Sequence, residues 1–193
     1  MSLNIVGISG SLDTPSRATT LVRILLAQSV AILGGRSTFI SIADLAPELG
    51  QSIDPAHLTP KVQAAQQSLG EADLLVVASP IYTASYSGLL KHFFDLLDPL
   101  ALQGKVAILA ATGGSEQLAL TLEHQLRPLL SFFGVHTVPT ALFAHDQSFL
   151  KDINGDYTLT DSLLRERIGR VLAETAHLLE PSRLAPPLYA RFG

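Results

Sequence analysis

Five short, almost uninterrupted apolar runs recur along the chain, and they constrain its fold more than any other feature. They are rich in Val, Ile, Leu and Ala and span residues 3–9, 37–42, 73–79, 105–112 and 136–144. A run that is apolar at every position, rather than at alternate ones, indicates a strand buried on both faces. Because segments with helical periodicity separate the runs, the pattern predicts a parallel sheet covered by helices on both sides.

The segments between the runs predict the helices. Apolar side chains recur at helical spacing within residues 17–33, 60–70, 89–98, 117–133 and 161–179, whereas residues 44–60 and 145–160 are expected to be loops. Five parallel strands favour an α/β fold of the flavodoxin-like type, a three-layer sandwich with a five-stranded parallel sheet in the order 2-1-3-4-5. We expect a single domain over residues 1–180 and a proline-rich tail over residues 181–193.

Charge and cysteine content argue against several functions. The 193 residues carry 13 Lys and Arg against 17 Asp and Glu, and they form no basic stripe of the kind that binds nucleic acid. We expect no signal peptide, membrane span or metal site, and the cytoplasm is the expected location. Since the chain has no Cys, a redox function needs a bound cofactor.

Three loops are expected to meet at one edge of the sheet. For the order 2-1-3-4-5, the switch point lies between strands 1 and 3, and ligands bind outside the carboxyl ends of the strands there. The loops in question span residues 10–20, 79–88 and 112–116, and all three are rich in Gly, Ser, Thr or Tyr. Their predicted convergence points to a binding site more strongly than any one of them alone.

The first loop resembles a cradle for an anion but matches neither common phosphate motif. It lacks the glycine triplet of a dinucleotide-binding turn and the lysine of a P-loop. It offers instead the hydroxyls of Ser11, Ser16, Thr19 and Thr20, the N–H groups of a helix start, and the guanidinium of Arg17, which suits a phosphate monoester. The alternative is that Ser16 only caps the helix and Arg17 is a solvated first-turn residue.

The other two loops suit a planar ligand. Tyr82 and Tyr86 are placed to flank a ring, backbone groups of residues 81–83 face its edge, and Gly113–Gly114 permits close approach of the backbone. Alternatively, the tyrosines lie at the edge of the core and the glycines form an ordinary turn. Taken together, the three loops predict a phosphorylated planar cofactor, and FMN is the natural candidate.

With these loops placed, the sequence resembles the NAD(P)H-dependent FMN reductases of the flavodoxin-like superfamily, in particular the flavin reductases that serve alkanesulfonate and methanesulfonate monooxygenases. The resemblance covers about residues 1–180 and is carried by GISGSLDTPSRATTLV, SPIYTASYSGLLKHFFDLLDPLALQGK, LAATGGSE and EHQLRPLLSFFG. It implies phosphate contacts from Ser11, Ser16, Arg17 and Thr19, and flavin-ring contacts from Pro80, Ile81, Tyr82, Thr83, Gly113 and Gly114.

One departure from the family pattern predicts loose binding of FMN. The broader group of reductases often carries an arginine and an asparagine in the first loop, where this chain has Asp13 and Ala18. Arg17 is then the only cationic partner expected for the phosphate. Weak, exchangeable binding of FMN would follow.

A local distortion is expected in the helix that contains Pro128. Proline removes the hydrogen bond to the carbonyl of His124, and Leu118, Leu122, Leu126 and Leu130 are spaced by four residues rather than 3.6. We predict a π-bulge or kink near His124, and the resemblance implies that such a bulge lies near the flavin and a subunit interface. The alternative is a mild kink with His124 on the surface.

The sequence therefore predicts NAD(P)H-dependent reduction of FMN, with the reduced FMN passed to a partner monooxygenase of the sulfonate type. No side chain is assigned as acid, base or nucleophile, because the flavin carries the hydride chemistry. The alternatives are an FMN-containing quinone, azo-dye or metal-ion reductase and a flavodoxin-type electron carrier. The choice between NADH and NADPH stays open.

An apolar helical segment at residues 89–102 predicts self-association. Its large side chains offer more apolar surface than one face of a sheet needs, and the resemblance also favours a homodimer or homotetramer. The alternative is a fully buried helix. The side chains concerned are Phe93, Phe94, Leu96, Leu97, Leu100 and Leu102.

Overall fold

The computed structural model describes residues 2–180, so the predicted tail at 181–193 lies outside the described residues. A parallel sheet forms the centre of this part of the chain, in the strand order β2-β1-β3-β4-β5, and β6 also pairs with β4. The predicted flavodoxin-like architecture is thereby confirmed. The strands are β1 (Asn4–Ser9), β2 (Arg36–Ser41), β3 (Leu74–Pro80), β4 (Val106–Gly113), β5 (His136–Thr137) and β6 (Leu142–His145).

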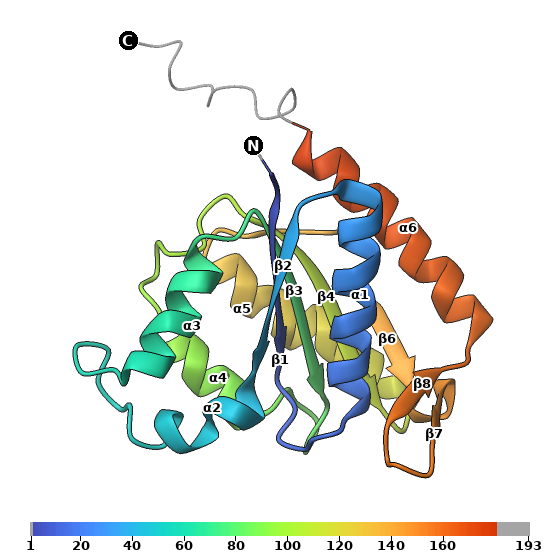
Figure 1. Cartoon of the computed structure of the whole chain (residues 1–193), viewed down its shortest axis with the longest axis horizontal. Coiled ribbons are helices and arrows are strands. Elements are labelled where there is room, and N and C mark those ends of the chain that lie inside the picture. The colour runs from blue at the N-terminus through green and yellow to red at the C-terminus, as the bar shows by residue number, and fades with distance from the viewer. Residues whose placement is uncertain (1, 181–193) are drawn as a thin grey trace.

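Helices cover both faces of the sheet, and all the long strands run toward the lower edge in Figure 1. Helices α1 and α6 lie on one side, and α2 to α5 lie on the other (Figure 1). Within the described residues, no helix has the length and apolar character needed to cross a membrane. The helices are α1 (Arg17–Leu33), α2 (Ile42–Leu49), α3 (Pro60–Gly70), α4 (Gly88–Asp95), α5 (Arg127–Phe132) and α6 (Ser162–Leu179).

Two hydrophobic cores form because successive strand residues point to opposite faces of the sheet. In β3, Leu74 and Val76 pack with α1 and α6, whereas Leu75 and Val77 pack with α2 to α5. Gly7 allows α1 to lie close to β1, since a Cβ at this position would come within 2.6 Å of the Val22 side chain. The continuous apolar runs thus have the expected cause, burial on both faces.

The fifth predicted strand is split into two. Residues 136–144 were expected to form one strand, but β5 ends at Thr137 and β6 begins at Leu142. The backbone N–H of Val138 still donates to the Ala107 carbonyl, and Pro139 follows it. Because proline has no N–H to donate to the ladder, pairing with β4 lapses there and resumes four residues later.

The prediction of a loop over residues 44–60 is wrong in its first part, which belongs to α2. The Ser41 hydroxyl caps this helix by accepting the N–H of Asp44, and Ile42, Leu45 and Leu49 form its buried stripe. Pro47 lies inside the helix. In an eight-residue helix this proline removes only one hydrogen bond, and burial of the apolar stripe outweighs that loss.

The prediction of a loop over residues 145–160 is also wrong, because this segment contains a β-hairpin. Strands β7 (Phe149–Lys151) and β8 (Tyr157–Leu159) pair antiparallel, and buried Phe149 and Leu159 anchor them to the core under α1 and α6. The turn is closed by the Asp152 carboxylate, which accepts the N–H groups of Asn154 and Asp156. Strands of three residues are too short to show a period in the sequence.

The helix predicted to run through residue 133 contains a π-helix at Leu122–Leu126, so the bulge predicted near His124 is confirmed. The backbone N–H of Arg127 donates to the carbonyl of Leu122, five residues earlier. Pro128 has no N–H for the carbonyl of His124, which weakens the regular α-helical pattern at this point. His124 itself is exposed.

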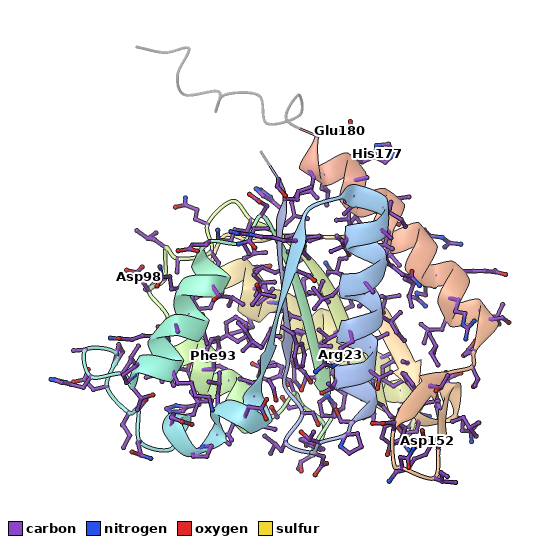
Figure 2. All side chains as sticks on the ribbon, in the orientation of Figure 1. Arg23, Phe93, Asp98, Asp152, His177 and Glu180 are labelled. Carbon is purple, nitrogen blue, oxygen red and sulfur yellow. The ribbon has the colours of Figure 1, made fainter. Side chains whose placement is uncertain are left out.

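The apolar side chains of residues 89–102 lie mainly in the chain's own core, which removes the sequence argument for an interface there. Phe93, Phe94, Leu96, Leu97 and Leu102 are all buried, and Phe93 lies between α4 and the sheet in Figure 2. Only Leu100 is exposed. The alternative of a buried helix is the correct one for this segment.

Asp161 joins the hairpin to the start of α6, and its loss should reduce stability. Its carboxylate accepts the Ser148 hydroxyl at 2.8 Å and the Leu164 N–H at 3.1 Å, and these bonds hold its pKa below the ordinary value. We expect Asp161→Ala to lower the free energy of unfolding by about 1 kcal/mol at neutral pH, as for other lost N-caps.

The pH dependence of this effect has a defined sign. A group whose pKa is lowered by folding stabilises the protein above its unfolded-state pKa, and this contribution is lost as the pH falls through the folded-state pKa. In urea unfolding experiments, the difference between wild type and Asp161→Ala should therefore shrink in acid. The matched control is Glu166→Ala, which removes an exposed carboxylate from the same helix. Equal destabilisation by both variants would contradict the capping role.

Candidate cofactor site

The loops after β1, β3 and β4 converge on one cavity of about 480 Å³ at the carboxyl end of the sheet, the lower edge in Figure 1. This volume lies within the range of about 300–1,000 Å³ usual for small-molecule sites. The lining is mostly polar and comes from four stretches of chain. Its residues are Ser11, Asp13, Thr14, Pro15, Ser16, Arg17, Ala18, Pro80, Ile81, Tyr82, Thr112, Gly113, Gly114, Asp146, Lys151 and Tyr157.

Hydroxyl groups hold the first loop in place at the start of α1. The Ser16 hydroxyl caps the helix by accepting the Thr19 N–H at 3.1 Å, and it also donates to the Thr19 hydroxyl. Thr19 in turn contacts the Ser9 hydroxyl at 2.9 Å, which ties the helix start to the end of β1. The buried Ser11 side chain accepts the N–H of Asp13. The capping role considered for Ser16 is therefore real, and Ser16 also faces the cavity.

The N-terminus of α1 leaves donors free within the cavity. Among residues 2–180, the N–H groups of Arg17 and Ala18 have no hydrogen-bond acceptor, as expected for the first turn of a helix. Ligand-free donors of this kind, together with the helix dipole, attract an anion. Both residues line the cavity.

Arg17 is held in the cavity rather than extended into solvent. Its guanidinium lies 4.7 Å from the centre of the Tyr157 ring, and its Nε lies 3.6 Å from the Asp146 carboxylate. That distance exceeds a hydrogen bond, and the buried Nε has no hydrogen-bond partner within the described part of the chain. The Arg17 side chain is therefore partly enclosed, with 35% of its surface exposed, and it lines the cavity.

The loop after β3 contains a tight turn with unusual backbone angles. Tyr82 and Ser85 exchange backbone hydrogen bonds of 2.8 and 3.0 Å, while Thr83 and Ala84 between them have φ angles of 48° and 64°. A positive φ is rare for a residue with a Cβ and disfavoured for a β-branched one such as Thr83. Such strain is maintained only where surrounding contacts impose it.

Gln125 of the π-helix supplies those contacts. Its side-chain amide donates to the Ala84 carbonyl at 3.0 Å and accepts the Ser85 hydroxyl. The adjacent Arg127 fixes the helix itself, since its guanidinium binds Glu123 and also donates to the Thr137 hydroxyl and the Val138 carbonyl. This pairing lowers the pKa of Glu123 and raises that of Arg127. The distorted helix is therefore linked directly to the strained loop.

The glycine pair after β4 leaves the third wall of the cavity open. A Cβ at Gly114 would meet only the Asp146 carboxylate, at 3.6 Å, whereas one at Gly113 would crowd Leu118 and Phe143 at 3.1 and 3.3 Å. Across the cavity, the Tyr82 hydroxyl donates to the Asp13 carboxylate at 3.3 Å and joins the first two loops. Tyr82 and the glycine pair thus line the same cavity.

Most of the residues expected at the site line this cavity. Thr19 and Thr83 do not: Thr19 supports the first loop from behind, and Thr83 forms the strained turn. Tyr86 does not line it either; it packs against the core, and burial raises its pKa. His124 is exposed on the π-helix and does not reach the cavity. The residues that do line it are Ser11, Ser16, Arg17, Pro80, Ile81, Tyr82, Gly113 and Gly114.

Sequence reasoning missed the wall contributed by the end of β6 and the hairpin. Asp146, Lys151 and Tyr157 line the cavity, and none belongs to the three loops expected there. Asp146 follows β6, so the rule that ligands bind at the carboxyl ends of strands would have identified it. Lys151 and Tyr157 lie in the short hairpin that the sequence pattern does not reveal.

A larger cavity of about 700 Å³ lies at the opposite end of the sheet, near the start of β4. Its lining includes Asp73, Lys105, His136 and Leu178. The Lys105 ammonium donates to the Ala72 carbonyl, and burial lowers its pKa. Because parallel α/β sheets bind ligands at the carboxyl ends of their strands, the smaller cavity is the candidate site.

Comparison with known proteins identifies relatives along nearly the whole chain. The family model described as NADPH-dependent FMN reductase matches residues 3–149. The NADH-dependent FMN reductase SfnF of Pseudomonas fluorescens is 43% identical over 186 residues, 96% of either chain. The FMN reductase (NADPH) of Pseudomonas aeruginosa is 41% identical over 172 residues, 89% of either chain.

Solved structures show the same architecture. An oxidoreductase from Corynebacterium diphtheriae superimposes with a TM-score of 0.79 at 34% identity, covering 92% of this chain and 97% of the other. The apo form of the NADH:FMN oxidoreductase EmoB also gives a TM-score of 0.79, at 31% identity over the full length of both chains.

Proposed function

The chain belongs to the NADPH-dependent FMN reductase family, and we propose that it reduces FMN with NAD(P)H and releases the reduced flavin to a partner monooxygenase of the sulfonate type. Reduction of FMN is the activity in the names of the relatives from both Pseudomonas species. Their names differ in the dinucleotide, so the proposal covers both NADH and NADPH.

The residues around the cavity fit FMN. A phosphate monoester matches the free N–H groups of Arg17 and Ala18 and the positive charge of the Arg17 guanidinium, both residues lining the cavity. A flat ring system matches the opening between Tyr82 and the backbone of Gly114. The fit therefore rests on unsatisfied donors at one end of the cavity and on open space at the other.

The role of the protein is to position the cofactor. Bound FMN supplies the hydride chemistry. Arg17 and the start of α1 hold the phosphate, and the segment 80–82 presents backbone groups to the edge of the ring. No side chain of the cavity is assigned a proton-transfer step. The single observation that carries the proposal is the convergence of three carboxyl-end loops on one cavity, with a helix N-terminus and Arg17 at one end.

A steady-state assay tests the proposal. With NADH or NADPH in excess, oxidation of the dinucleotide should rise and saturate as free FMN is added. Oxidation that ignores free FMN but requires a quinone or azo dye would favour a reductase with permanently bound FMN. If the protein does not oxidise NAD(P)H at all, the remaining alternative is an electron carrier of the flavodoxin type.

Asp146 provides a physical reason why FMN would bind weakly and exchange. Its carboxylate lies near the Arg17 guanidinium, so it competes with the phosphate for that cation and repels the phosphate. We expect Asp146→Asn to tighten FMN binding about fivefold, since partly exposed charge pairs contribute about 1 kcal/mol. Riboflavin, which has no phosphate, should bind equally well to both proteins. Fluorescence titration measures this, with Asp95→Asn as a control on exposed α4.

The proposed partners follow from the same reaction. They are FMN, NAD(P)H and a flavin-dependent monooxygenase, and the proposed location is the cytoplasm, where NAD(P)H is supplied. We also propose a homodimer or homotetramer, which sedimentation tests directly. Exposed apolar side chains such as Leu120 and Phe132, at either end of the π-helix segment, support an interface on that side.

A further inference from the structure

Apart from Phe149, the hairpin β7–β8 lies beyond the part of the chain that the family model matches, residues 3–149. Its two inner residues nevertheless face the proposed FMN site. Lys151 and Tyr157 are cross-strand partners in the hairpin, and both line the cavity. An element that lies almost entirely beyond the family-model match therefore contributes one wall of the site.

We propose that this hairpin makes the site selective for a phosphorylated flavin, with Lys151 acting as a second cation for the phosphate and Tyr157 as the platform that orients both cations. This inference rests on the proposed function of the cavity. It differs from the expectation from the sequence, in which Arg17 is the only cationic partner of the phosphate.

Both positive charges lie close to the Tyr157 ring, and both side chains line the same cavity. The Arg17 guanidinium lies 4.7 Å from the centre of the Tyr157 ring, and the Lys151 Nζ lies 5.6 Å from the same point. Both distances are within the range of cation–π attraction. The Asp146 carboxylate lies beside Arg17, and a phosphate bound in the cavity would supply an anion for Lys151 as well.

Lys151 is available for this role. Within residues 2–180, no carboxylate lies within ion-pair distance of its ammonium, whereas Lys61 and Lys91 both have such partners. The nearest acidic side chain on the hairpin, Asp152, uses its carboxylate to accept two backbone N–H groups of the turn. The long side chain of Lys151 therefore has a charge without a local partner.

The hairpin is fixed against the phosphate loop. A Cβ at Gly155, in the turn, would lie 3.7 Å from the Lys151 side chain and 3.8 Å from Pro15. Below the turn, Phe149 and Leu159 are buried, and the N–H of Thr160 donates to the Ser148 carbonyl. The hairpin, on which Asp152 is labelled in Figure 2, is thus an anchored wall of the site.

Paired titrations with FMN and riboflavin test the inference without relying on turnover. We expect Lys151→Ala to raise the Kd for FMN roughly fivefold to tenfold, as expected for loss of one charge-assisted contact. The Kd for riboflavin should stay at the wild-type value. Lys151→Arg should restore most of the FMN affinity, and the matched control Lys61→Ala, on α3, should change neither Kd.

Salt dependence and the dinucleotide provide further readouts. The FMN Kd of wild type should rise more steeply with ionic strength than that of Lys151→Ala, because one phosphate contact is missing in the variant. An unchanged FMN Kd in Lys151→Ala, or equal losses for FMN and riboflavin, would overturn the inference. A variant that changes only the ratio of the KM for NADPH to the KM for NADH would also overturn it, because Lys151 would then contact the phosphate of the dinucleotide. Failure of wild type to bind FMN would instead refute the proposed function.

Discussion

Arg17→Ala should raise the Kd for FMN by about 30- to 100-fold and leave the Kd for riboflavin nearly unchanged. The guanidinium lines the cavity beside the start of α1 and lies 4.7 Å from the centre of the Tyr157 ring. A hydrogen bond to a charged group contributes about 1.5–3 kcal/mol, and 1.4 kcal/mol corresponds to a factor of ten in Kd. Quenching of flavin fluorescence, titrated in parallel for FMN and riboflavin, measures both constants.

Two further variants keep this result interpretable. Arg36→Ala removes an exposed arginine at the start of β2 and should leave both constants unchanged. Arg17→Lys keeps the charge but loses the planar guanidinium, so it should recover only part of the affinity. If Arg17→Ala weakens riboflavin as much as FMN, Arg17 supports the loop structure and does not bind the phosphate.

Gln125→Ala should weaken FMN and riboflavin to the same extent, by about 20- to 30-fold. The Gln125 amide makes two hydrogen bonds to the strained turn at Ala84 and Ser85, and the backbone of Ser85 is bonded in turn to Tyr82, which lines the cavity. Each hydrogen bond contributes about 1 kcal/mol. In the variant, about 2 kcal/mol of the flavin's binding free energy would therefore be spent on ordering the turn. The matched effect on both flavins distinguishes this positioning role from the phosphate contacts of Arg17.

Amide hydrogen exchange tests whether Gln125 acts by ordering the turn. Amide hydrogen exchange in residues 82–87 should be faster in Gln125→Ala, because the turn loses the contacts that hold Thr83 and Ala84 at positive φ. Gln63→Ala, on exposed α3, provides a matched control. Unchanged exchange together with unchanged affinity would show that the turn is maintained without the π-helix.

The two variants divide the cavity into a phosphate end and a ring end. Lys151 and Asp146 belong with Arg17, since their substitution should affect FMN alone and in opposite directions. Gln125 and Tyr82 belong with the ring, where the presence of a phosphate makes no difference. Titration of each variant with FMN and with riboflavin distinguishes the two ends of the cavity.

The sequence predicts what is encoded locally. Burial of β1, β3 and β4 on both faces produces continuous apolar runs, and Ser16 followed by a helical pattern predicts the start of α1. Pro128 removes a specific hydrogen bond, which made the π-helix predictable as well. The convergence of three loops follows from strand order alone.

Features that depend on distant contacts were not predictable in the same way. Thr83 and Ala84 give no Gly or Asn signal for positive φ, because Gln125, some 40 residues later, imposes it. One extra residue in a helix rotates the following side chains by about 100°, so spacing alone did not show that Gln125 reaches the turn. Lys151 was missed because tertiary burial of Phe149 and Leu159, rather than local pattern, forms the hairpin.

A crystal structure of the protein soaked with FMN tests the central claim most directly. We predict FMN in the cavity at the carboxyl ends of β1, β3 and β4, with its phosphate at the N–H groups of Arg17 and Ala18 and within hydrogen-bond distance of the Arg17 guanidinium. The ring should lie between Tyr82 and Gly114. FMN bound in the larger cavity near Lys105, or bound here with Arg17 directed away from the phosphate, would contradict it.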